Sequence, residues 1–242
     1  DRAAQSGDRR AHALSKLELA RVDQRRGDYD RAEMRLTEAI DELSDLGESF
    51  GLARCYNALG DIARQTGRYD RAREHARSAR KIFEEGGSQT GLADCVNDLA
   101  ELSLLQGDAK RAEELCERAL ELYRSVGSLQ SVRVRLNLGF IHLALGRWER
   151  ARETLESARV HFVRRDKRGG LLHADAYMLP CLVEAEQWDA FDQRRANVEE
   201  LLEATGFQTE RLRRAAILAA TMCDERGERE RANKVRELVR DE

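Results

Sequence analysis

A short motif that begins with glycine returns along the chain at a nearly constant interval, and this periodicity limits the fold more than any other feature. Residues 27–32 read GDYDRA, and related segments begin at Gly67, Gly107, Gly146 and Gly227. The first three steps are 40, 40 and 39 residues, and the last step of 81 residues contains one degenerate copy at 187–191. Repeats of this length are typical of solenoid proteins, so we expect six stacked structural units.

The composition predicts that every unit is helical. The chain has 1 Pro in 242 residues and is rich in Ala, Leu, Arg and Glu, which favour helices. Each motif glycine separates two helical stretches, and glycine commonly follows the end of a helix. Small residues recur 12 positions before and 7 positions after the motif alanine, which allows two helices to pack closely. Leucines that precede the first small residue are expected to fill the seam between helices: Leu19, Leu59, Leu99 and Leu138.

The spacing of these small residues resembles that of the tetratricopeptide repeat family. The pattern is carried by Leu59-Gly60, Ala72 and Ala79, and it returns at 99–119 and 138–158. The unit of 40 residues is longer than the common unit of about 34. In this it is similar to the repeats of the LGN/Pins scaffold, kinesin light chain and sensor regions of bacterial signalling proteins. The resemblance implies an all-α, right-handed superhelix of about six helix-turn-helix repeats.

We expect a single solenoid domain over residues 1–242, with repeats at 10–47, 48–87, 88–127, 128–166, 167–206 and 207–242. The chain lacks an initiator Met, so we interpret it as a fragment of a larger protein. The fifth unit departs from the pattern, because Leu179 and Phe191 stand where other units have small residues. Pro180 falls inside its first helix, where proline removes a backbone hydrogen bond. The pairs Gly86-Gly87 and Gly169-Gly170 are expected to be turns between repeats.

Charge and cysteine usage exclude several classes of protein. Lys and Arg total 42 and Asp and Glu total 45, which argues against a nucleic-acid binder that works through bulk charge. The longest apolar stretches, 138–146 and 171–183, are shorter than the roughly 20 residues that span a bilayer. The N-terminus has no apolar signal segment. The 5 Cys form no C-x-x-C pair and fit reduced, buried thiols. We therefore expect a cytoplasmic protein without nucleic-acid or membrane partners.

The first helix of each unit is expected to line the concave side of the solenoid. Its candidate groove positions are polar in units two and three and more apolar afterwards. They are Arg54, Asn57, Asp61, Arg64, Asp94, Asn97, Glu101, Arg133, Leu136, Asn137, Phe140, Leu143 and His173.

The asparagines of this set are the candidates for peptide contact. An Asn side chain offers both an acceptor and donors, so Asn57, Asn97 and Asn137 are suited to hold an extended backbone without reading its sequence. The resemblance to LGN and kinesin light chain implies the same role for these residues together with Arg54 and Arg133. A second interpretation stays open, in which the Asn bond neighbouring helices and the Arg pair with carboxylates of the chain.

No arrangement of residues points to catalysis. The five His never stand at metal-ligand spacing from one another or from Cys, and the glycine pairs match no phosphate-binding loop. We expect no enzyme activity, no metal and no cofactor. The leading hypothesis is a protein-interaction module that binds an extended peptide or protein segment, with groove Arg favouring acidic side chains. The alternative is a sensor region of a multidomain bacterial signalling protein, a Ser/Thr kinase or a transcription activator, that binds an effector.

Overall fold

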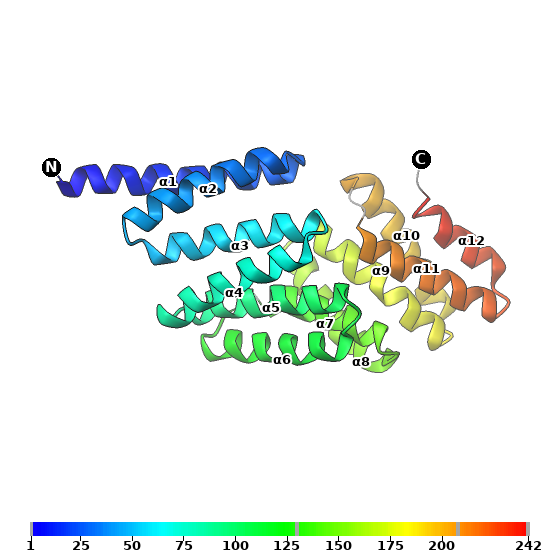
Figure 1. Cartoon of the computed structure of the whole chain (residues 1–242). Helices are drawn as coiled ribbons and strands as arrows, with labels where there is room; N and C mark the ends of the chain where they lie inside the picture. Colours follow the sequence, from blue (N-terminus) through cyan, green and yellow to red (C-terminus); the bar gives the residue numbers. More distant parts are fainter. Residues whose placement is uncertain (1, 129–130, 207–208, 241–242) are drawn as a thin grey trace. The chain divides into compact units, whose positions relative to one another are not determined.

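The computed structural model describes residues 2–128, 131–206 and 209–240, and these residues form helices, turns and no strand (Figure 1). The fold is all-α, as predicted, and the two helices of each pair run antiparallel. The chain divides into two compact units, Asp1–Ser128 and Leu129–Glu242, which are described one at a time. No described helix is both long and apolar enough to cross a membrane.

Unit 1 consists of three helix pairs. Their bounds are α1 (Arg2–Arg26), α2 (Tyr29–Asp45), α3 (Ser49–Gln65), α4 (Tyr69–Glu85), α5 (Gln89–Leu105) and α6 (Ala109–Ser125). Each helix packs on the next one along the chain, α1 on α2, α2 on α3, and so on to α6. The core is built from the small residues of the repeat together with larger side chains such as Leu17, Leu36 and Ile62, all without exposed surface.

Unit 2 also consists of three helix pairs. Their bounds are α7 (Ser131–Ala144), α8 (Trp148–Arg164), α9 (Arg168–Glu184), α10 (Trp188–Thr205), α11 (Glu210–Glu225) and α12 (Arg229–Glu237). Helix α9 is the centre of this unit, because α7, α8, α10 and α11 all pack on it. The sequence explains this place, since almost every residue from 172 to 183 of α9 is buried. Pro180 lies inside α9, as the sequence predicts.

The turn inside every pair except α9–α10 is made by the motif glycine, and Glu186 adopts a positive φ at that place in α9–α10. Gly107 has a φ of +83°, which a residue with a side chain rarely adopts. Its N–H donates to the carbonyl of Leu104 at 3.0 Å, and the next N–H, of Asp108, donates to Ser103 at 2.9 Å. These bonds satisfy carbonyls left open at the end of α5. The Asp108 side chain then accepts from the N–H of Arg111 and starts α6.

The joint between successive pairs is made by an apolar side chain and a second glycine. Phe83, near the end of α4, lies so close to Gly91 of α5 that a Cβ atom at Gly91 would stand 2.4 Å from its ring. Phe162 of α8 and Gly170 of α9 make the same contact at the same distance. We call this contact the pair joint. It brings the last turn of a second helix onto the first turn of the next pair.

Two expectations from the sequence are wrong. Gly169 and Gly170 are not a turn but lie within α9, and Gly170 is needed there for the pair joint. Leu19 does not fill a seam, because it is 49% exposed on α1. Leu59, at the equivalent place in α3, packs against the preceding pair. Among the described residues, no helix pair packs over Leu19 as the α1–α2 pair packs over Leu59.

The pair joint predicts opposite outcomes for two adjacent glycines of α9. We expect Gly170→Ala to lower the free energy of unfolding by about 1–3 kcal/mol, because the new methyl group overlaps the buried Phe162 ring. Gly169→Ala should lower nothing, because a Cβ there has no atom within 4 Å. Denaturant unfolding followed by circular dichroism measures both variants. Equal stabilities would show that the close contact with Phe162 is absent.

Candidate functional site

The first helices of unit 1 form a layer of their own. Helix α1 contacts α3, and α3 contacts α5, whereas no comparable contact joins α2 with α4 or α4 with α6 among the described residues. Where successive helices touch in only one of the two layers of a stack, the stack is shorter on the side of that layer. The first helices therefore line the inner side of unit 1, which is the surface that helical-repeat proteins use for binding.

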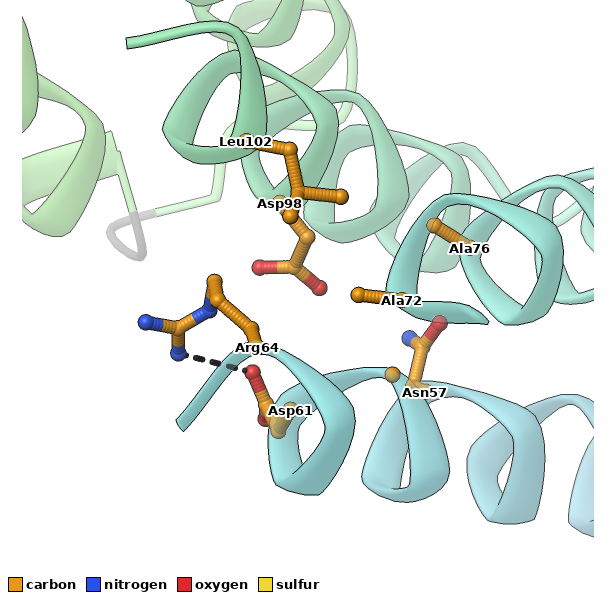
Figure 2. A pocket seen from close by; sticks show the side chains of 8 residues that line it. Asn57, Asp61, Arg64, Ala72, Ala76, Asp98 and Leu102 are labelled. Carbon is orange, nitrogen blue, oxygen red and sulfur yellow. Dashed lines mark hydrogen bonds and ion pairs between the residues drawn. The ribbon is translucent and has the colours of Figure 1, made fainter. Parts of the chain in front are cut away.

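Charged side chains of α3 bridge this inner layer. Nη2 of Arg54 lies 2.5 Å from Oε1 of Glu18 on α1. Nη2 of Arg64 lies 3.0 Å from Oδ1 of Asp61 (Figure 2). Nη1 of Arg64 lies 3.2 Å from Oε2 of Glu101 on α5. Burial opposes the charge of Arg64, but Glu101 and Asp61 outweigh it and raise the pKa of the guanidinium. Ion pairs thus connect α1, α3 and α5 along the inner face.

The hollow beside Arg64 is too small for a metabolite. It offers about 10 Å³, which is roughly the room that one water molecule needs. Figure 2 shows Asn57, Asp61 and Arg64 of α3 around it, opposite side chains of α4 and α5. A pocket for a drug-sized ligand has several hundred Å³. The hollow beside Arg64 therefore has no room for such a ligand.

The polar residues of α3 and α5 lie at different depths. Asn57 is partly exposed, and its Oδ1 accepts from the thiol of Cys95 at 3.2 Å. Burial raises the pKa of Cys95 to about 12, so this thiol stays protonated and donates. Asp94 is also partly exposed and accepts from the hydroxyl of Tyr123. Asn97 has no exposed surface, so it does not present its amide to solvent.

The candidate residues of α7 in unit 2 are mostly covered. Arg133 is exposed, and Leu136 is partly buried against the cluster of Ala158, Phe162 and Ala174. Asn137 is only 5% exposed, and its Oδ1 accepts from Nη1 of Arg211 on α11 at 2.9 Å.

The apolar candidates of unit 2 belong to its core. Phe140 packs on Tyr177 of α9 with 4.8 Å between ring centroids, and Leu143 is buried. His173 lies with Nδ1 2.7 Å from the carbonyl of Gly169 and Nε2 3.0 Å from Oγ1 of Thr209. Burial lowers the pKa of His173, which favours the neutral ring. Nδ1 then donates to Gly169, and Nε2 accepts from the hydroxyl of Thr209.

One buried carboxylate of α9, that of Asp175, was not predicted from the sequence as a site residue. Asp175 has no exposed surface, and its Oδ1 accepts from Nε of Arg159 on α8 at 2.7 Å and from Nη1 of Arg194 on α10 at 2.6 Å. Glu156 lies 3.1 Å from Arg194 and adds a second carboxylate. The available signal was an acidic residue inside the apolar stretch 171–183. Such a residue requires a partner, since an unpaired buried charge is very costly.

Asp175 predicts a particular pH dependence of stability. Burial raises the pKa of Asp175 from 3.8 to about 6, although Arg159 acts in the opposite direction. Because the folded chain holds this proton more tightly than the unfolded chain, the stabilisation is present below the unfolded pKa and is lost as pH rises through about 6. Unfolding of the wild type and Asp175→Asn should show this slope in the wild type only. The same slope in both would assign it to another group.

Comparison with known proteins agrees with this architecture. Both units are stacks of antiparallel helix pairs, which defines an all-α helical-repeat protein. The model of the tetratricopeptide repeat family matches residues 9–85 and 92–159. The chain therefore belongs to the tetratricopeptide repeat family. No curated protein sequence matches the chain.

Solved structures give the same fold at low sequence identity. Aspartyl phosphate phosphatase F from Bacillus subtilis is 14% identical with a TM-score of 0.73, over 96% of this chain and 61% of that protein. A Rap protein in complex with competence and sporulation factor is 11% identical with a TM-score of 0.69, over 93% and 73%. A signal transduction ATPase with a tetratricopeptide repeat sensor from Pyrococcus horikoshii is 14% identical with a TM-score of 0.68, over 94% and 36%. The chain thus spans under two thirds of two of these proteins.

Proposed function

We propose that the chain is a protein-interaction module that holds an extended peptide or protein segment along the inner face of its first helices. The observation that carries the proposal is the inner layer of α1, α3 and α5, whose surface is polar and bridged by ion pairs. The tetratricopeptide repeat family consists in general of non-catalytic interaction scaffolds, although one structural neighbour is named a phosphatase. A Rap protein among the neighbours is described in complex with competence and sporulation factor, which agrees with such a role.

The partly exposed residues of α3 and α5 are the proposed contacts in unit 1. They are Arg54, Asn57, Asp61, Arg64 and Asp94. Asn97 and Glu101 lie beneath these residues and do not face a partner, because both are buried. An acidic side chain of a partner would replace Glu18 at Arg54 or Asp61 at Arg64. Such an exchange leaves the number of ion pairs unchanged, so it contributes more to specificity than to affinity.

Arg133 is the exposed candidate of unit 2, and we propose the same role for it there. The single continuous domain expected from the sequence also stays a proposal. The five free cysteines fit a reducing compartment, so we propose that the protein is cytoplasmic.

Peptide selection tests the proposed face. A displayed library of random peptides is selected on the full chain, and the affinity of the enriched peptides is measured for two variants. We expect Arg54→Ala with Asp61→Ala to weaken binding at least about tenfold, because these side chains line the inner face. The matched control is Arg80→Ala with Glu84→Ala, an exposed pair on α4. A loss in the control, or none in the inner-face variant, would refute the proposal.

We propose as a second function that the chain is the sensing region of a longer signalling protein. The observation that favours it is the likeness to 36% of a signal transduction ATPase with a tetratricopeptide repeat sensor. The full reading frame tests this idea. It is supported if the frame encodes an output domain whose activity changes in the inner-face variant. It fails if no such domain is encoded.

A further inference from the structure

The last helix pair is attached differently from the pairs that begin with α3, α5 and α9. Gly51 of α3 takes the same place as Gly91 and Gly170, because a Cβ atom there would stand 3.1 Å from Leu43 of α2. Each of these glycines lies 16 residues before the turn residue of its pair, which is Gly67, Gly107 or Glu186. The residue 16 positions before Gly227 is Arg211. An Arg side chain leaves no room for a close approach of the preceding helix. The sequence therefore removes one half of the pair joint between α10 and α11.

A second packing position, on the preceding helix α10, is altered as well. Residues Leu36, Ala76 and Leu155 of α2, α4 and α8 are buried, and the equivalent residue of α10 is Arg195. Arg195 pairs with Glu199 at 2.8 Å on the same helix. As a result α10 and α11 make no contact comparable to that of α8 with α9 among the described residues. Helix α11 packs on the first helix α9 instead.

Polar bonds hold the start of α11 on the inner residues of α7 and α9. Arg211 donates to Asn137 of α7, and Thr209 bonds His173 of α9 while its oxygen caps α11 through the N–H of Leu212. Two of the candidate groove residues of unit 2 are thus bonded by the chain itself. The apolar part of the contact is modest, because four of the seven buried residues of α11 are alanine.

We propose that the α11–α12 pair is a displaceable cap, which occupies in unit 2 the kind of surface that the proposed partner binds in unit 1. When the cap opens, α11 and α12 leave α9 as one body, and Asn137 and His173 become accessible on α7 and α9. The cap competes with a partner for these residues. The role of the cap as a competitor rests on the proposed function. Opening of the cap is measured without any partner, so the cap and the proposed function can fail independently of each other.

Hydrogen exchange and histidine modification of the full chain test the cap. The test variant is Arg211→Ala, which removes the bond to Asn137. The matched control is Arg214→Ala, because the Arg214 side chain pairs with Glu210 of its own helix. We expect backbone amides of α11 and α12 to exchange at least about tenfold faster in Arg211→Ala, with α8 unchanged. Carbethoxylation of His173 should rise in parallel, while the exposed His12 reacts equally in all proteins.

Three results would overturn the cap. The first is exchange in α11 and α12 that is as slow as in α8 in every protein, because the pair then opens only with the whole unit. The second is fast exchange without faster modification of His173, because fraying of the chain end produces that pattern. The third is an equal effect of Arg214→Ala.

Discussion

Replacing Asp175 by Ala is expected to lower the free energy of unfolding by about 3 kcal/mol. The change removes the oxygen that accepts from both Arg159 and Arg194, and it leaves these two partly buried guanidinium groups between α8, α9 and α10 without this acceptor. The loss lies at the lower end for a broken buried ion pair, because both arginines keep about a fifth of their side chain exposed. Denaturant unfolding followed by circular dichroism measures it.

Two further variants make this prediction specific. Asp166→Asn changes an exposed carboxylate in the same unit and should alter stability by no more than about 0.5 kcal/mol. The double variant Asp175→Ala with Arg194→Gln should lose less than the sum of the two single changes, because both remove one interaction. Strictly additive losses would show that Asp175 and Arg194 do not stabilise each other.

The second large effect is expected for Phe191→Ala, a change that restores the residue of the other five units. Ala32, Ala72, Ala112, Ala151 and Ala232 occupy this place elsewhere, and all are buried. In the fifth unit the Phe191 ring has no exposed surface and packs edge-on against Trp188. Its removal leaves a cavity beside α9, so we expect a loss of about 3–5 kcal/mol in unfolding free energy.

The outcome separates two views of the fifth unit. If the unit has only drifted from the repeat, the consensus alanine should be tolerated or should stabilise the chain. If Phe191 and Leu179 fill one altered core, the alanine must destabilise it. Phe50→Ala is the control, because this ring is 54% exposed and its loss should cost much less. Equal losses for the two variants would contradict the packing of Phe191.

The fold was predictable because it depends on spacing. Gly27, Gly67, Gly107, Gly146 and Gly227 all have positive φ, and the helices begin and end around them as the motif indicates. The repeat alone could not distinguish a turn glycine from a packing glycine. Gly170 was therefore misread, because its role depends on Phe162, which packs against it from the preceding helix.

The candidate site was less predictable, because depth and pairing are properties of the packed structure. Asn57 and Asn97 occupy equivalent positions in the sequence, yet only Asn57 keeps exposed surface. The bond from Arg211 to Asn137 joins residues 74 positions apart, which no local pattern announces. Asp175 was visible as a lone acid in an apolar stretch, but its two arginine partners come from other helices.

Photo-crosslinking shows which face of unit 1 holds a bound peptide. A photoreactive benzoylphenylalanine replaces Asp61 on the inner face of α3 in one protein and the exposed Ser78 of α4 in another, and each is irradiated with a selected peptide. If the peptide lies along α1, α3 and α5, we expect a crosslink to it from position 61 and none from position 78. A crosslink from position 78 alone would place the partner on the outer helices and contradict binding along the inner face.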